Sequence, residues 1–363
     1  MSVVTSDPLQ FHWSMPVGGL QKEGSGEREI GSYDIEEMVE FAQKAEALGI
    51  EQLLLAVGFH CPDPFTYVGT LIRATKKIKF LLAYRAGTVS PTTFVQMVNS
   101  LSALGDNRLT LNLLAGISPV EQKYYGDHLA KDDRHTRLDE FIGICQQYWQ
   151  TEAPVDSKGT YYDIEQGQLH IGYCNRASQS PEIFLSGNSD VTMNCAIERQ
   201  ITWLRYSDTV DNIAEAIKPA VAAGIGVGLR MSTIVRENKA DVMTKIDEMM
   251  RGVDEEWAAV VADFMKTVDS TAVKAVANIA EQAEGDWVDE MIWSGAVRFR
   301  GGPSLAMAGT PEEVANYIMR YKAAGVTAFI LSGWTQLEEM EYFSKLVIPL
   351  IRAKEQALLA IAA

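Results

Sequence analysis

The sequence predicts an α/β protein: a single (β/α)8 TIM-barrel domain with insertions, spanning residues 1–363. Short apolar runs alternate with amphipathic helical stretches along the chain, a pattern typical of parallel βα units. The chain offers eight such runs, enough to close a ring. No Gly-x-Gly-x-x-Gly follows the first run, which disfavours a doubly wound dinucleotide-binding sheet. Because a barrel of about 250 residues is typical, the surplus length predicts insertions.

The first half of the chain supplies four strands, each followed by a helix. Asp34 is a suitable N-cap, Gly49 suits the left-handed position after a helix, and Ser90 precedes Pro91 in the order that opens helices. A glycine-rich loop follows the first strand, with glycines at 18, 19, 24 and 26. We expect strands at 9–15, 52–57, 78–84 and 109–115, and helices at 34–48, 64–75, from 91 onward and at about 133–150.

Two insertions interrupt the second half, at about 151–181 and at 253–300. The first has few helix formers and holds strand-like pieces at 160–164 and 169–171. The second begins as helix and becomes irregular near 295–303. We expect both to lie over the mouth of the barrel. The remaining strands are expected at 182–185, 201–204, 228–235 and 328–332, with helices from 189, from 211 to about 224, and at 239–251, 310–324 and 336–354.

The composition excludes several classes of function. Hydrophobic residues make up 47% and charged residues 22%, which rules out global disorder. The formal charge of −16 disfavours sequence-independent binding to nucleic acid or to an anionic membrane. Without a secretion signal or a long apolar run, a cytoplasmic protein is expected. The four cysteines form no Cys-x-x-Cys pair and the five histidines no His-Glu-x-x-His motif, so neither a disulfide framework nor a zinc site is expected.

Function in a barrel collects at the carboxyl ends of the strands, so the residues there are the candidates. Ser186-Gly187-Asn188-Ser189 follows the fifth expected strand and opens a helix. Small residues let backbone N–H groups approach a ligand, and a helix N-terminus favours an anion such as a phosphate. A plain serine N-cap would explain the same residues. Arg230 lies within a strand between Leu229 and Met231, and burying its charge requires a partner.

The other candidates are weaker, and no acid–base or nucleophilic constellation emerges. Cys61 follows His60, which would lower a thiol pKa, but neighbours on an extended segment point apart. A buried small side chain explains Cys61 equally well. His135, at the start of a helix, either donates to an anion or is solvated. Arg300 fits a surface ion pair, and the tryptophans fit either packing or stacking on a flat cofactor, at 287, 293 and 334.

Short segments at these strand ends match one known family in order and spacing over almost the whole chain, from about 11 to 349. These segments lie at 79–85, 90–92, 107–116, 187–191, 229–237, 293–295, 300–302, 329–333 and 337–339. On these segments the sequence resembles the bacterial-luciferase-like, flavin-dependent monooxygenases. Within that family it is most similar to the two-component alkanesulfonate monooxygenases.

The resemblance implies a (β/α)8 barrel that binds reduced FMN (FMNH2), delivered by a separate NAD(P)H-dependent flavin reductase. O2 would add to the flavin to form a peroxyflavin, which oxygenates a small organic substrate such as an organosulfur compound or a natural-product intermediate. The flavin carries the difficult chemistry, while the protein orients it and excludes water. A homodimer or homotetramer is implied as well.

The resemblance also assigns residues. The flavin phosphate would be held by Ser186, Gly187, Asn188 and Ser189. The flavin would further be lined by Asn112, Ala115, Arg134 and His135. Active-site positions would be occupied by His60, Cys61, Arg230, Ser232, Arg300 and Trp334. Arg300 would belong to a mobile lid formed by residues 253–300, with Gly301 and Gly302 as hinge candidates.

Several pocket positions depart from the family pattern. Ser232 stands where relatives have a histidine, and Trp334 where they have a tyrosine. Ala115 replaces a threonine or serine, His135 a tyrosine, and Arg205 lies near a missing tryptophan. These changes argue against a simple alkanesulfonate as substrate. They leave two alternatives: an oxidoreductase of the same fold that transfers hydride with the deazaflavin F420, and a flavin-binding relative that has lost activity.

Overall fold

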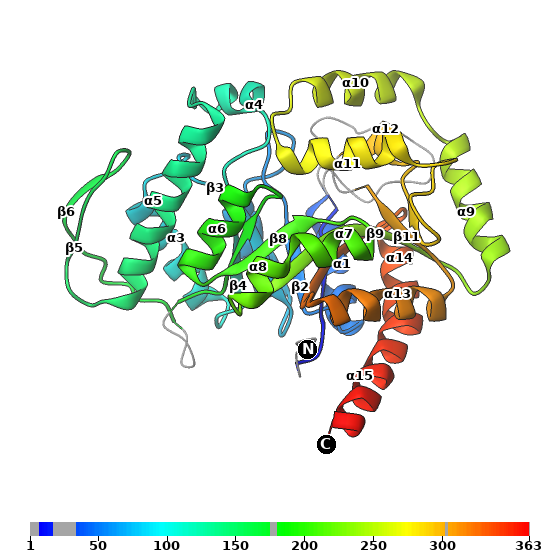
Figure 1. Ribbon diagram of the computed structural model, residues 1–363. Helices are drawn as coiled ribbons and strands as arrows, with labels where there is room; N and C mark the ends of the chain where they lie inside the picture. Colours follow the sequence, from blue (N-terminus) through cyan, green and yellow to red (C-terminus); the bar gives the residue numbers. More distant parts are fainter. Residues whose placement is uncertain (1–6, 17–33, 175–179, 302–303, 363) are drawn as a thin grey trace.

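The computed structural model describes residues 7–16, 34–174, 180–301 and 304–362 (Figure 1). Eight parallel strands close into a barrel, because β9 pairs with both β8 and β12 and so joins the two ends of the sheet. The barrel order is β1-β2-β3-β4-β7-β8-β9-β12. These strands are β1 (Gln10–Ser14), β2 (Gln52–Leu55), β3 (Lys79–Arg85), β4 (Leu109–Leu114), β7 (Ile183–Ser186), β8 (Thr202–Tyr206), β9 (Val227–Val235) and β12 (Ala328–Ser332). The predicted barrel is confirmed.

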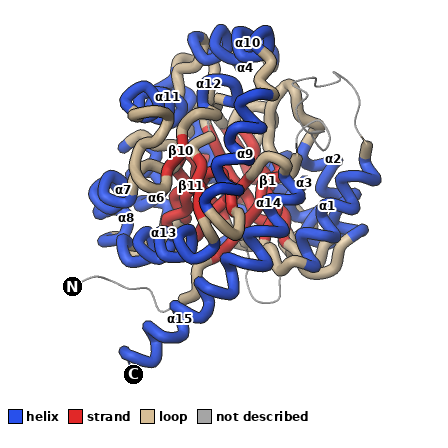
Figure 2. The backbone as a smooth tube through the Cα atoms, turned by 90° about the vertical axis from the view of Figure 1, so that its right-hand side faces the viewer, coloured by secondary structure: helices blue, strands red, loops and turns tan. Residues whose placement is uncertain are grey.

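Helices cover the outside of the barrel, as the tube view shows (Figure 2). Their caps follow the sequence signals: Asp34 accepts N–H bonds of the first helix, and Ser90 and Thr310 each precede a proline at the helix start. The covering helices are α1 (Ile35–Ala47), α2 (Pro64–Ala74), α3 (Pro91–Leu104), α5 (Lys131–Gln150), α6 (Asp190–Arg199), α7 (Val210–Ala216), α8 (Lys218–Ala222), α13 (Pro311–Ala324), α14 (Gln336–Tyr342) and α15 (Ile348–Ala362), with a π-helical turn at Phe343–Val347.

Alternation along the strands divides the core into two layers. On β1, Phe11 and Trp13 join the large cluster between strands and helices. His12 points to the barrel axis, where its ring meets Phe184 of β7 edge-on at 6.1 Å. The interior layer is apolar at mid-height, with Leu54, Leu81, Ala83, Phe184, Leu204 and Ile330. The barrel is therefore filled below its mouth, and a ligand can enter only above this layer.

The insertion at 151–181 differs from its expected place. It forms a hairpin of β5 (Val155–Lys158) and β6 (Asp163–Gly167), while 169–171 forms no strand. Glu140 of α5 accepts the N–H groups of Tyr161 and Tyr162, and Asn99 of α3 donates to the carbonyl of Ile171. These bonds hold the hairpin against the outer side of α5 and α3 (Figure 1). The expectation that this insertion covers the mouth is wrong.

The insertion at 253–300 does lie over the strand ends, as expected (Figure 1). After α9 (Lys239–Arg251) it forms α10 (Glu255–Lys266), α11 (Thr271–Gln282) and α12 (Val297–Arg300). The sequence pattern missed two strands: β11 (Ala306–Gly309) pairs parallel to the end of β9, and β10 (Ile292–Trp293) pairs antiparallel to β11. It also missed α4 (Pro119–Tyr124). The glycine-rich loop at 18–26 and the hinge candidate Gly302 lie outside the described residues.

No helix in the described part of the chain is both long enough and apolar enough to cross a membrane. The same residues contain no cluster of three His, Cys, Asp or Glu side chains that could hold a metal ion.

A buried ion pair ties the last helix to α13, and a backbone hydrogen bond ties it to the residue before β1. Glu355 of α15 accepts from Lys322 Nζ of α13 at 2.9 Å and from the backbone N–H of Leu9 at 2.7 Å. We expect Glu355→Gln to lower the free energy of unfolding by about 3 kcal/mol, because removing one partner leaves a buried charge uncompensated. Glu341→Gln is the control, since its pair with Lys345 is exposed. Urea unfolding measures both variants, and equal losses would contradict the expectation.

Candidate active site

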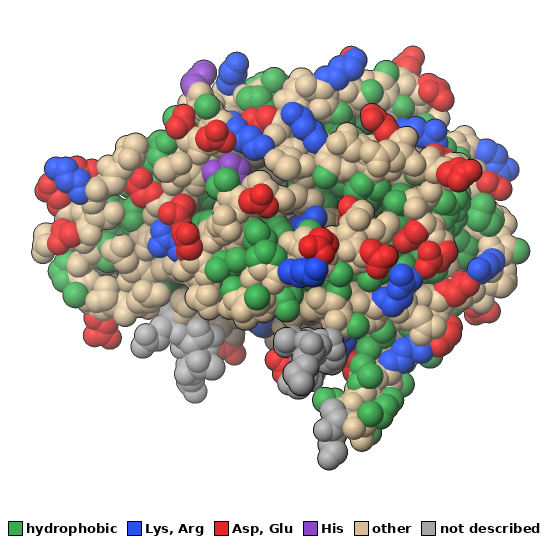
Figure 3. Space-filling view, viewed as in Figure 1, with side chains coloured by type: hydrophobic (Ala, Val, Ile, Leu, Met, Phe, Trp, Pro, Cys, Tyr) green, Lys and Arg blue, Asp and Glu red, His purple; other side chains and the backbone are tan. Residues whose placement is uncertain are grey.

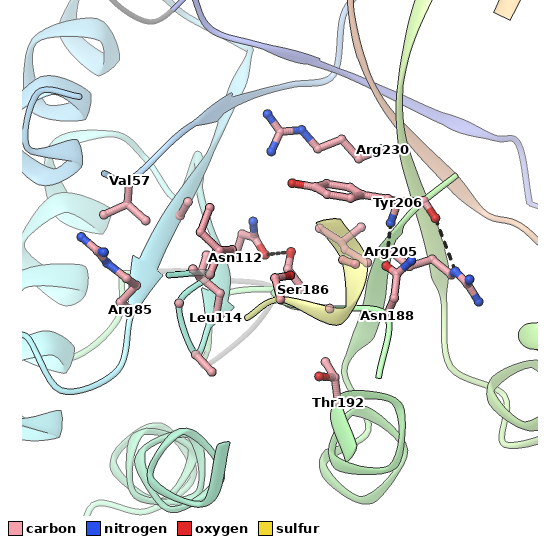
Figure 4. A pocket seen from close by; sticks show the side chains of 18 of the residues that line it. Val57, Arg85, Asn112, Leu114, Ser186, Asn188, Thr192, Arg205, Tyr206 and Arg230 are labelled. Carbon is pink, nitrogen blue, oxygen red and sulfur yellow. Dashed lines mark hydrogen bonds between the residues drawn. The ribbon is translucent and has the colours of Figure 1, made fainter. Parts of the chain in front are cut away.

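A pocket of about 210 Å³ opens at the carboxyl end of the barrel (Figure 4). Its walls come from the ends of most barrel strands, and residues of α10 and α11 close it from above. Four lining residues carry a positive side chain and one a carboxylate; they are Lys131, Arg85, Arg205 and Arg230 against Glu121. The protein as a whole has a charge of −16, and acidic side chains are spread over the face shown in Figure 3. The pocket is thus locally suited to an anion.

The turn between β7 and α6 forms one wall. Ser189 is the N-cap of α6, and its hydroxyl accepts the backbone N–H of Thr192 at 3.3 Å. The hydroxyl groups of Ser189 and Thr192 lie 2.9 Å apart, and both residues line the pocket. Two hydroxyls and the positive end of a ten-residue helix therefore face the same space.

Glycine is required at position 187 of this turn. Its φ is +151°, and a Cβ there would approach Thr192 Oγ1 to 2.8 Å. The neighbouring strand fixes the turn: Trp203 Nε1 donates to the carbonyl of Gly187 at 2.6 Å, and the N–H of Tyr206 donates to Asn188 Oδ1 at 2.9 Å. The turn is thus held rigidly by β8 before any ligand arrives.

Asn112 lies on β4, the strand next to β7, and is joined to this turn. Its Oδ1 accepts the hydroxyl proton of Ser186 at 2.6 Å, so its amide nitrogen is directed elsewhere in the pocket (Figure 4). Ala115 and Gly116 follow at the strand end. Gly116 has a φ of +95°, and a Cβ there would collide with Gln122 of α4, so this end of the wall also needs glycine.

A buried ion pair forms the wall at the carboxyl end of β3. Arg85 Nη1 lies 3.0 Å from Glu121 Oε1, with both side chains almost fully buried. Glu121 also accepts the backbone N–H of Phe59, which fixes the loop after β2. The Arg85 guanidinium packs over the ring of Tyr125, 4.3 Å from its centroid. Arg85 is therefore neutralised by the protein itself.

Arg230 of β9 is in a different state. It projects into the pocket above Tyr206 (Figure 4). Its Nε is buried without a hydrogen-bond partner in the described part of the chain, as are nitrogens of Arg85, so the two arginines differ in their counter-charge. Within the described residues no carboxylate pairs with it, whereas Arg85 has one. Arg230 is half-buried and has no counter-charge among the described residues, so an anionic ligand would be favoured at this point.

The first turn of α5 lines the pocket with Lys131 and His135. Burial lowers the pKa of His135 from 6.5, and the charges of Lys131 and Arg134 add to the effect. His135 is accordingly neutral at pH 7 and offers one donor and one acceptor to a ligand.

The pocket brings together nine of the fourteen predicted site residues: His60, Asn112, Ala115, His135, Ser186, Gly187, Asn188, Ser189 and Arg230. The other five do not line it. Cys61 is half-buried in the loop after His60, and the Ser232 hydroxyl lies 2.9 Å from that of Ser332. Arg300 lies with its guanidinium carbon 5.3 Å from the ring centroid of Trp334, outside the pocket.

Arg134 also lies elsewhere than the resemblance implied. Its guanidinium is turned toward Asp269, with Nη2 at 2.7 Å and 3.0 Å from the two carboxylate oxygens. Sequence reasoning missed other lining residues, notably Glu121, Tyr206 and Phe264. A signal existed for Glu121, because Ser118-Pro119 has the same cap arrangement as Ser90-Pro91. No local signal marked Phe264, which reaches the pocket only through the fold of the insertion.

The lowered pKa of His135 predicts a pH effect on stability. Above pH 6.5 the folded and unfolded chains are both neutral at this residue. As the pH falls through 6.5 the unfolded chain binds a proton that the folded chain resists, so folding becomes less favourable. We expect His135→Gln to lose less stability than the parent between pH 7.5 and pH 5.5, measured by urea unfolding. Parallel pH curves would contradict a neutral His135.

Comparisons with known proteins agree with this architecture. The model of the luciferase-like monooxygenase family matches residues 9–328. A solved riboflavin lyase, described with modified FMN and riboflavin, has a TM-score of 0.77 at 18% identity and covers 96% of this chain and 92% of its own. A long-chain alkane monooxygenase has a TM-score of 0.75 at 16% identity, with the same coverages. An F420-dependent secondary alcohol dehydrogenase has a TM-score of 0.65 at 16% identity and covers 95% and 99%.

Identities this low establish a shared fold and leave cofactor and substrate open. The family match is stronger evidence, because it spans most of the chain, from β1 to the start of β12. Its span includes every lining residue of the pocket described above except Ile330. On this match, the chain belongs to the luciferase-like monooxygenase family.

Proposed function

We propose that the protein is the oxygenating component of a two-component system. It would bind reduced FMN released by an NAD(P)H-dependent reductase and oxygenate a small organic substrate. The observation that carries this proposal is the pocket itself. A helix N-terminus and Arg230, which no carboxylate of the described residues pairs, face one space at the mouth of a family barrel. A homodimer or homotetramer in the cytoplasm belongs to the same proposal.

The residues at the turn between β7 and α6 fit the phosphate end of FMN. The rigid turn at 186–189 offers the hydroxyls of Ser189 and Thr192 beside the first N–H groups of α6. A Cβ at Gly187 would collide with the Thr192 side chain in this turn. Glycine at this position therefore lets the backbone of the turn approach a phosphate. Lys131 lines the same pocket and adds a positive charge to it.

The residues also fit a flat, partly polar ring system deeper in the pocket. Leu54, Ala83 and Ile330 supply an apolar surface, and the Asn112 amide and neutral His135 supply hydrogen-bonding groups. Bound reduced FMN would supply the electrons that activate O2. The protein would orient the ring and substrate, and the α10–α11 cover would exclude water. Arg230 would meet an anionic group of the ligand or substrate.

Oxygen consumption separates this proposal from its two alternatives. Reduced FMN and air are supplied with a panel of thioethers, sulfonates and small aromatic amines, and the products are identified by mass spectrometry. We expect substrate-dependent oxygen uptake with a product heavier by one oxygen atom. Turnover with reduced F420 and none with reduced FMN would favour the hydride-transferring alternative. Tight binding of oxidised FMN with no product would favour the non-catalytic one.

Ser189 tests the phosphate assignment. We expect Ser189→Leu to weaken anaerobic binding of reduced FMN by about tenfold or more, on the order of 1.4 kcal/mol. The reason is that the substitution removes the Ser189 hydroxyl and places a bulky side chain in the space beside the start of α6. Fluorescence titration measures the affinity.

Ser90→Leu is the matched control for Ser189→Leu. Ser90 caps α3 in the same way, with its hydroxyl accepting the N–H of Thr93, but does not line the pocket. Both variants lose a helix cap, which costs about 1 kcal/mol of stability. Equal flavin affinities in the two variants would remove the assignment.

A further inference from the structure

The helices α10 and α11, which cover the pocket, are tied to the barrel by three residues of the stretch 267–271. In the connection from α10 to α11, Asp269 donates its backbone N–H to the carbonyl of Ile117 at 3.1 Å. Thr267 Oγ1 lies 3.3 Å from Ser118 Oγ, and Thr271 Oγ1 accepts from Lys131 Nζ at 2.8 Å. These anchors come from the loop after β4 and from the first turn of α5.

A fourth contact between the barrel and the α10–α11 connection is the buried ion pair of Arg134 and Asp269. The Arg134 side chain is 1% exposed, and Nη2 bonds both carboxylate oxygens of Asp269, at 2.7 Å and 3.0 Å. Its Nη1 donates to the carbonyl of Leu129 at 3.0 Å, which fixes the guanidinium to the barrel side. Among the ion pairs of the described residues, Asp269 is the partner of Arg134. Losing it would leave a buried cation uncompensated.

Residues 131–135 at the start of α5 contact both the pocket and the α10–α11 segment that covers it. Lys131 and His135 line the pocket on either side of Arg134 in sequence, while Arg134 points to Asp269. On the cover, Ser270, Thr271 and Ala272 line the pocket directly after Asp269, and Phe264 lines it from α10. A change at this pair therefore reaches both walls of the pocket.

We propose that Arg134 and Asp269 are positioning residues that clamp the α10–α11 cover across the pocket. Neither touches the ligand space. They act by fixing Phe264 and the start of α11 over the site, so that water is kept from the reacting groups. The clamp itself is a property of the ligand-free chain. Only its effect on water near the reacting groups rests on the proposed flavin function.

The test compares Asp269→Asn with the parent by hydrogen–deuterium exchange of the ligand-free protein. The variant keeps the shape and the backbone bond to Ile117 but loses the charge. We expect amides of 264–276 to exchange about tenfold faster, while β4 and the rest of α5 are unchanged. Arg134→Lys, which keeps the charge but loses the second nitrogen that binds the Leu129 carbonyl, should give a smaller increase.

Asp263→Asn is the matched control, because Asp263 lies on the same cover and pairs with Lys266 on the exposed surface. Exchange in that variant should equal the parent. Unchanged exchange in Asp269→Asn, an equal effect of Asp263→Asn, or faster exchange spread through β4 and α5 would each overturn the clamp. The last result would make the pair a general stabiliser.

A second readout uses bound reduced FMN mixed with air, without substrate. We expect Asp269→Asn to reoxidise the flavin about tenfold faster than the parent, with flavin affinity changed less than about threefold. If exchange changes as expected but reduced FMN does not bind the parent, the proposed function fails and the clamp stands. If reduced FMN binds the parent but exchange is unchanged, the clamp fails alone.

Discussion

Closure of the parallel sheet is the constraint on which the rest of the structure depends. β9 pairs with β8 on one side and β12 on the other, so no strand of the barrel is left as an edge. Because all eight strands run the same way, their carboxyl ends meet around one mouth. Side chains from positions as distant as Asn112, Ser186 and Arg230 therefore reach one pocket. The apolar layer at mid-height closes the barrel beneath them.

The charge at the mouth of the barrel depends on which of its arginines are paired with carboxylates. Arg85 is matched by Glu121 and Arg134 by Asp269, and both pairs serve the protein's own structure. Arg230 faces the pocket, and the described ranges of the chain place no carboxylate beside it. In a protein of charge −16, the positive side chains that line this pocket make its local charge differ in sign from the net charge of the protein. The α6 N-terminus provides a second, separate point for negative charge.

The sequence predicted what periodicity and caps control. The eight barrel strands were found because each is a short apolar run, and helix starts such as Ser90-Pro91 were found from their caps. Prediction from the sequence failed for elements whose position depends on contacts between residues far apart in the chain. The hairpin at 151–181 lies against α5 because Glu140 binds its backbone, and β11 exists because the end of β9 offers a free partner. The turn at 186–189 was predicted as a phosphate site and lines the pocket, whereas the ion pair of Arg134 depends on where residue 269 lies in the fold.

A crystal structure of the protein with FMN tests the central claim most directly. The account predicts the phosphate within hydrogen-bonding distance of Ser189 and Thr192, at the start of α6. It predicts the flavin ring over the apolar layer, between Asn112 and Arg230. A flavin bound outside this pocket, or bound in reverse with its phosphate at Arg230, would contradict it.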